Sequence, residues 1–92
     1  MRDVVAQVRR QDLELARQMV RAASSVAANI AEGNRRSGKD RSYHFRIAAG
    51  SAEETRAHLR VAEAWGYVEH RQIEAALNLV DRQLALLWGL TT

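Results

Sequence analysis

Glu54 and His58 come nearest, in residue type and spacing, to a reactive or metal-binding pair. A spacing of four places them one turn apart on one helix face, where a carboxylate and an imidazole can meet. Metal sites in helical bundles instead use Glu-x-x-His pairs together with several further carboxylates. The spacing therefore favours an ion pair or a hydrogen bond, and we expect no metal, no cofactor and no catalytic residue, so that the protein is not an enzyme.

Asn29 and Glu32 are polar residues near the end of a long apolar-periodic segment. Glu32 opposes the helix dipole there, so it should have a compensating partner such as an arginine. Two interpretations remain open, a solvated helix end and a buried polar latch between helices. The latch would consist of Asn29, Glu32, Ser51 and Glu54. Gly33 follows at the position where a left-handed residue is expected just past a helix end.

Positively charged side chains crowd the polar connection that comes next. The predicted phosphate contacts are Arg35, Arg36, Lys39 and Arg41. A second group lies along the preceding helical segment and consists of Arg9, Arg10, Arg17 and Arg21. Such clusters bind phosphate backbones in a salt-dependent way, and they are also typical of a solvated face. Tyr43 alone is aromatic near the connection, so base stacking is not expected.

The elements that position these residues are all predicted to be helical, and the chain contains no proline. Met1 to Glu32 has no breaker and favours one continuous helix. The alternative is that Asp12 acts as an N-cap and splits this segment near residues 10–12. A second helix is expected from Ser37 or Gly38 to about Trp65, and a third from about Arg71 to Gly89.

Helical periodicity predicts which faces of the two later helices are buried. The second helix carries a core stripe at Phe45, Ala48, Ala52, Thr55, Leu59 and Ala62. A neighbouring stripe, available to another chain, consists of Ile47, Ser51, Glu54, His58, Val61 and Trp65. The third helix has a seam at Ile73, Leu77, Val80, Leu84 and Leu87, widened by Leu79, Leu86 and Leu90. We therefore expect an all-α, up-and-down antiparallel bundle of three long helices.

Length and composition limit the remaining possibilities. Ninety-two residues predict a single domain, 1–92, and much of the 47% hydrophobic content is alanine, which buries little area per contact. Self-association is the expected way to obtain enough core. The net charge of +3 permits an anionic partner. The chain has no cysteine and no run long enough to span a membrane, so we expect a cytoplasmic protein.

Two motifs in order resemble the four-helix bundle proteins encoded in 23S rRNA intervening sequences. The first is Arg21-Ala22-Ala23 with Ser25-Val26-x-Ala28-Asn29-Ile30-Ala31-Glu32-Gly33. The second is Ile47-Ala48-x-Gly50-Ser51-x-x-Glu54, followed downstream by Gly66-Tyr67. Ala27 stands where the family usually has proline, and the family's long first helix is cut down or lost.

The resemblance implies a homopentamer and, through its genetic context, a connection with rRNA. We expect a non-catalytic oligomeric protein whose basic surface contacts RNA or DNA phosphates. The alternative is a protein-interaction scaffold that uses exposed apolar helix stripes.

Overall fold

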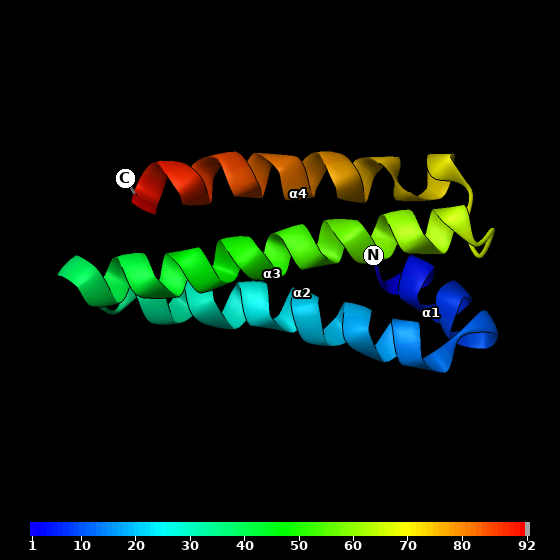
Figure 1. The fold of residues 1–92 in the computed structure, drawn as a ribbon, viewed down its shortest axis with the longest axis horizontal. Helices are drawn as coiled ribbons and strands as arrows, with labels where there is room; N and C mark the ends of the chain where they lie inside the picture. Colours follow the sequence, from blue (N-terminus) through cyan, green and yellow to red (C-terminus); the bar gives the residue numbers. More distant parts are fainter. Residues whose placement is uncertain (92) are drawn as a thin grey trace.

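The computed structural model describes residues 1–91, in which four α-helices and no strand are found. The helices are α1 (Arg2–Gln11), α2 (Leu13–Asn34), α3 (Gly38–Ala64) and α4 (His70–Thr91). Figure 1 shows α2, α3 and α4 lying side by side, each reversing the direction of the one before. The predicted all-α class is confirmed. No helix of residues 1–91 combines the length and the apolar character needed to cross a membrane.

The prediction of one continuous helix from Met1 to Glu32 is wrong, because Asp12 interrupts it. Asp12 has extended backbone angles (φ −154°, ψ 93°), and its side chain accepts a hydrogen bond of 3.0 Å from the backbone N–H of Leu15. This is an N-cap, which satisfies one of the free donors at the start of α2. The alternative interpretation, a split near residues 10–12, is the one that the structure adopts.

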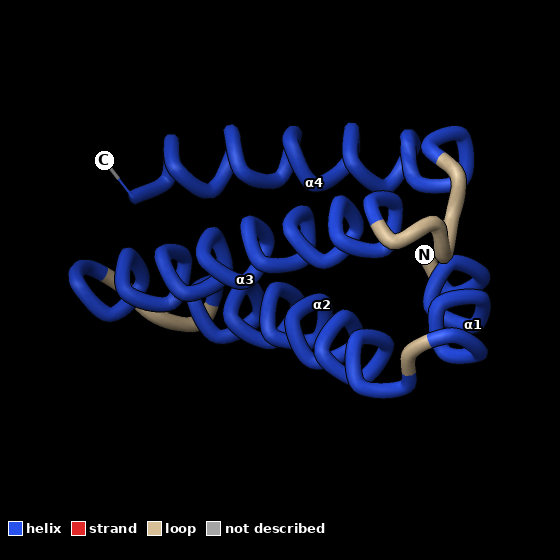
Figure 2. Tube along the Cα trace, turned by 45° about the vertical axis from the view of Figure 1, so that its right-hand side comes forward, coloured by secondary structure: helices blue, strands red, loops and turns tan. Residues whose placement is uncertain are grey.

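The break at Asp12 folds α1 back beside the first half of α2 (Figures 1 and 2). A helix of 10 residues reaches only about half the length of the 22-residue α2. At the α1 end, Val4 and Val8 join a core formed with α2, α3 and α4. At the other end, the described core consists of residues from α2, α3 and α4 without α1. The bundle therefore has four helices at one end and three at the other.

The predicted seams of α3 and α4 are buried as expected. Every residue of the core stripe on α3 and of the seam on α4 is less than 9% exposed. The neighbouring stripe on α3 is divided, since Ser51 is buried whereas Val61 and Trp65 are exposed. Leu79, Leu86 and Leu90, predicted to widen the α4 seam, are also exposed. These large apolar side chains therefore lie outside the core.

Two glycines near helix ends, Gly66 and Gly33, have different structural roles. Gly66 follows α3 with φ +76°, so it supplies the left-handed residue expected there. The same prediction for Gly33 is wrong, because α2 continues to Asn34 and Gly33 keeps a negative φ. Gly33 is buried instead against the ring of Phe45, so its missing side chain allows a close approach of α2 and α3.

Candidate nucleic-acid interface and its polar supports

A row of polar side chains joins α2 to α3; we call Ser25, Asn29, His44 and Ser51 the polar seam. Ser51 Oγ donates to Ser25 Oγ at 2.7 Å. The Asn29 amide nitrogen donates to the carbonyl oxygen of Ser25 at 2.9 Å, and Asn29 Oδ1 lies 3.0 Å from His44 Nδ1. The amide oxygen can only accept, so His44 carries its proton on Nδ1 in this contact. These bonds fix the register of α2 against α3.

Glu32 lies at the end of α2, outside the polar seam. Its carboxylate forms ion pairs with Arg35 and Arg36, and the Arg36 pair measures 2.8 Å between Nη2 and Oε1. Hydrogen bonds from the two arginines lower the pKa of Glu32 to about 2, and the bond from Arg35 has the larger effect. Glu32 in turn raises the pKa of Arg36. The arginines thus compensate the unfavourable position of an acid at a helix C-terminus.

Glu54 and His58 meet one turn apart on α3, as their spacing predicts. His58 Nε2 lies 3.4 Å from Glu54 Oε1, and this nitrogen is buried without a hydrogen bond to any described residue. The Glu54 side chain itself is 58% exposed. Within residues 1–91, no three His, Asp or Glu side chains converge as metal ligands would. Glu54 and His58 therefore form a contact between residues i and i+4 of α3, at the edge of the exposed side of that helix.

The four residues predicted to form one polar latch therefore do not meet at a single site in the structure. Asn29 and Ser51 are brought together through Ser25, whereas Glu32 contacts its own helix end and Glu54 contacts His58. Sequence reasoning missed Ser25 and His44 as members of the polar seam. The spacing of four between Ser25 and Asn29 was an available signal, since such pairs face each other on a helix. His44 had no comparable local signal.

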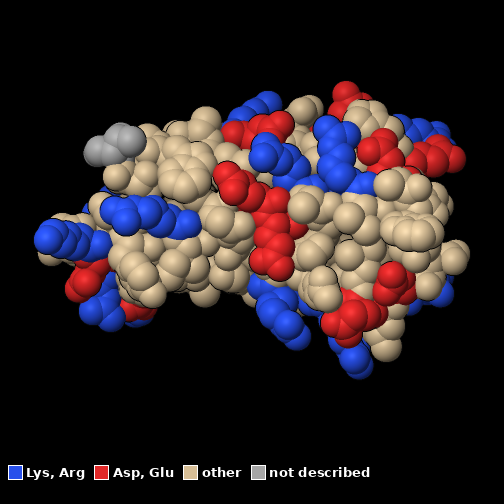
Figure 3. Space-filling model, viewed as in Figure 1, with Lys and Arg blue, Asp and Glu red and all other residues tan. Residues whose placement is uncertain are grey.

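The four predicted phosphate contacts differ in their surroundings. Arg35 and Arg36 are exposed and share Glu32. The Arg41 guanidinium lies over the Phe45 ring, 4.8 Å from its centroid, and is half-buried. Lys39 is exposed, with no ion pair to a residue in the described part of the chain. Figure 3 shows Lys and Arg at this end of the molecule, with acidic side chains among them. The loop is basic but partly neutralised.

A second basic surface lies where α1 folds back on α2; we call Arg9, Arg10, Arg17 and Arg21 the hairpin arginines. A hollow of about 450 Å³ is bordered by Arg9 and Arg10 together with Arg2, and one of about 260 Å³ by Arg9 and Arg17. All four hairpin arginines are exposed, and none forms an ion pair with residues 1–91. The break at Asp12 creates this surface, because it brings the end of α1 beside α2.

Comparison with known proteins identifies a family. A protein-family model described as "23S rRNA-intervening sequence protein" matches residues 3–89 of the chain. No curated protein and no solved structure matched. The matched range includes the whole polar seam, the loop cations and the hairpin arginines.

Proposed function

This chain belongs to the family of 23S rRNA-intervening sequence proteins, and on that premise we propose that it is a non-catalytic, oligomeric protein that binds nucleic acid, with RNA as the first candidate. One observation carries the proposal: the four hairpin arginines are exposed and have no acidic partner in residues 1–91, and Arg9, Arg10 and Arg17 border hollows at the α1–α2 fold-back. Unpaired guanidinium groups keep all five N–H donors and their full charge for phosphate oxygens.

The loop cations provide a second set of phosphate contacts. Each of Arg35 and Arg36 keeps donors that Glu32 does not use, because a guanidinium has five N–H groups. Together the three side chains carry one net positive charge. Lys39 adds a free ammonium at the same connection. The hairpin arginines therefore contribute more to affinity than the loop does, since their charges are not already compensated.

Binding of this kind recognises the backbone and shape of a nucleic acid more than its bases. Contacts to phosphates position a protein without carrying sequence information. Tyr43 is exposed beside the loop, but one ring is not the series of aromatic side chains that stacks on successive bases. Double-stranded RNA, which is recognised mainly through phosphates and 2′-hydroxyls, is the most suitable ligand.

Assembly of several copies would repeat both basic surfaces and raise avidity without new contacts. The exposed Trp65, Leu79 and Leu86 favour assembly, because large apolar side chains on a surface often mark interaction sites. The homopentamer that the resemblance implies stays a prediction, as does the cytoplasmic location.

The alternative function is a protein-interaction scaffold. The same exposed apolar side chains favour it, since they could contact a different protein while the charges keep the assembly in solution. Under this alternative, removal of the basic residues would leave partner binding intact.

Charge-removal variants test the proposal and separate the two basic surfaces. The hairpin variant replaces the four hairpin arginines by Gln, and the loop variant replaces Arg35, Arg36, Lys39 and Arg41 by Gln. The matched control replaces four cations of α3 and α4 by Gln, namely Arg56, Arg60, Arg71 and Arg82. All three variants lose four positive charges, so a difference between them reports position and not net charge.

Binding to a short RNA duplex is measured at low salt by filter retention. We expect the hairpin variant to lose roughly tenfold or more in affinity, the loop variant less, and the control least. A variant that contacts fewer phosphates releases fewer counterions on binding, and this release is what favours the complex. Equal losses in all three variants would mean that only net charge matters. Absence of wild-type binding would remove the proposal.

A further inference from the structure

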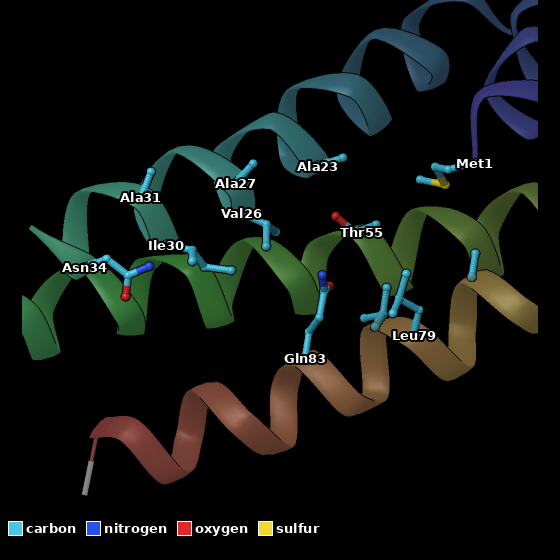
Figure 4. Close-up of a pocket in the computed structure, with 12 residues that line it drawn as sticks. Met1, Ala23, Val26, Ala27, Ile30, Ala31, Asn34, Thr55, Leu79 and Gln83 are labelled. Carbon is cyan, nitrogen blue, oxygen red and sulfur yellow. The ribbon is translucent and has the colours of Figure 1, made fainter.

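A hollow of about 530 Å³ lies between α2 and α4, with α3 as its floor. Figure 4 shows Val26 and Ile30 pointing into it from α2, while Leu79 and Gln83 reach toward it from α4. Thr55 of α3, which is only 4% exposed, borders the bottom of this space. Three helices of one chain therefore border a single space.

Small side chains on α2 produce this hollow. Ala23, Ala27 and Ala31 follow one another at a spacing of four and all border it. Residues four apart share one face of a helix, so α2 presents methyl groups where larger side chains would fill the space. The first helix does not fill it either, because α1 packs beside the first half of α2 and Met1 only borders one end.

The lining is apolar and carries no charged side chain. Among residues 1–91, none of those that border the hollow is Asp, Glu, Lys or Arg. Thr55 already donates its hydroxyl proton to the carbonyl oxygen of Ser51 at 2.9 Å. The side-chain amides of Asn34 and Gln83 form no hydrogen bond within the described part of the chain. These two amides thus keep their donors and acceptors for a ligand.

The two amides occupy one end of the hollow. Asn34 and Gln83, together with Ile30, also border a second hollow of about 170 Å³ that extends to Leu86. They therefore mark the junction between two apolar spaces. A ligand that satisfies an amide must carry its hydrogen-bonding group at this junction and its apolar part toward Met1.

We propose that this hollow binds an uncharged, mostly apolar small molecule with a hydrogen-bonding group that contacts the Gln83 amide. Small-molecule sites are typically clefts of roughly 300 to 1,000 Å³ with an apolar lining and a few polar groups. The volume and the lining of this hollow match that description. Such a ligand displaces water from apolar side chains, and this displacement favours binding. The inference does not depend on RNA binding, whose proposed contacts lie elsewhere.

The absence of charge in the lining determines which ligands are disfavoured. A carboxylate or phosphate group would lose its hydration without gaining a cationic side chain, and burial of an unpaired charge is costly. The hollow of about 260 Å³ at the α1–α2 fold-back is different, because Arg9 and Arg17 border it and suit an anionic ligand. Ligand charge therefore distinguishes the two places.

A matched pair of fluorescent probes tests the inference. N-phenylnaphthylamine is uncharged and has one N–H donor, whereas anilinonaphthalene sulfonate has the same rings and an added negative charge. Both probes brighten when they leave water. The uncharged probe should saturate at about one molecule per chain, with an affinity that salt leaves unchanged, since no ion pair forms in an uncharged lining. Any binding of the sulfonate probe should weaken as the salt concentration rises.

Three variants locate the uncharged probe. Ala27→Trp places an indole in the hollow and should abolish its binding. Ala57→Trp is the matched control, because Ala57 is also exposed on a helix but does not border the hollow. Gln83→Leu removes the amide and should weaken binding roughly two- to tenfold, because one hydrogen bond is lost. Binding of the sulfonate probe should change in none of these variants. Circular dichroism and light scattering compare the fold and the mass of the variants with the wild type.

The outcomes separate this inference from its alternatives. A wild-type protein that does not bind the uncharged probe overturns it, and so does binding that survives Ala27→Trp. Loss of probe binding together with a changed mass in Ala27→Trp would assign the hollow to an interface between copies instead. Unchanged binding by Gln83→Leu overturns the role of the amide. Filter retention of RNA should be the same in all three variants, so a failure here leaves the proposed function standing.

Discussion

Gly33 in α2 lies directly against the ring of Phe45 in α3. A Cβ atom at residue 33 would come 2.5 Å from Cε1 and 2.7 Å from Cδ1 of that ring, closer than the 3.0 Å that real Cβ atoms keep. Phe45 is only 1% exposed and has little room to move aside. The missing side chain of Gly33 therefore sets the distance between the two helices at the end that carries the loop cations.

Gly33→Ala should lower the free energy of unfolding by about 1–3 kcal/mol, because an added methyl group overpacks a filled core. The measurement is urea denaturation followed by circular dichroism. Gly50→Ala is the matched control, since Gly50 is also inside a helix but a Cβ atom added there would meet nothing within 4 Å. That change should raise the free energy of unfolding by about 1 kcal/mol through helix propensity. Equal effects of the two substitutions would contradict the close-approach role of Gly33.

Asp12→Ala should destabilise the protein by about 1 kcal/mol, because α2 loses the side chain that caps its Leu15 N–H. Asp12→Asn keeps an oxygen acceptor and should remain close to the wild type. Thermal unfolding of both variants checks this. If the two variants lost stability equally, the charge of Asp12 and not its cap would be the important feature.

Glu32 should make stability fall in acid. Its folded pKa of about 2 lies below the ordinary 4.5, so the unfolded chain takes up the proton first as the pH falls. The stabilisation from this carboxylate is complete above pH 4.5 and is lost as the pH drops toward 2. Glu32→Gln should therefore flatten this part of the plot of unfolding free energy against pH. Glu53→Gln, at an exposed acid without an ion pair to residues 1–91, should leave the slope unchanged.

The polar seam should show coupling between α2 and α3. Ser25→Ala and Ser51→Ala each remove one partner of the 2.7 Å hydrogen bond, and each should cost about 1 kcal/mol. The double variant should cost less than the sum of the two, because a single interaction is lost only once. Strict additivity in this double-mutant cycle would show that the hydrogen bond contributes nothing to stability.

Much of the fold could be predicted from the sequence, because burial here follows helical periodicity. Phe45 and Leu59 on α3, and Ile73 and Leu84 on α4, lie in the core as their spacing indicates. The break at Asp12 could not be decided in the same way. Both a capped turn and an exposed Asp within a continuous helix satisfy the local pattern, and the choice depends on Val4 and Val8 reaching the core only when α1 folds back.

The candidate site was less predictable, since its contacts join residues distant in sequence. Glu32 obtained the arginine partners that its position at a helix end required. The contact between Asn29 and His44 depends on how α2 and α3 align, which no local spacing determines. The different surroundings of Arg36 and Arg17 are likewise tertiary features, because only the folded chain shows which cation already has an acidic partner.

Salt dependence of RNA binding tests the central claim most directly. The logarithm of the affinity of the wild-type protein for a short RNA duplex is plotted against the logarithm of the salt concentration. Phosphate contacts by the hairpin arginines and loop cations predict a straight line of negative slope, which becomes shallower by about 0.9 for each contact that the hairpin variant removes. A flat line, or no retention of RNA at low salt, would contradict the account.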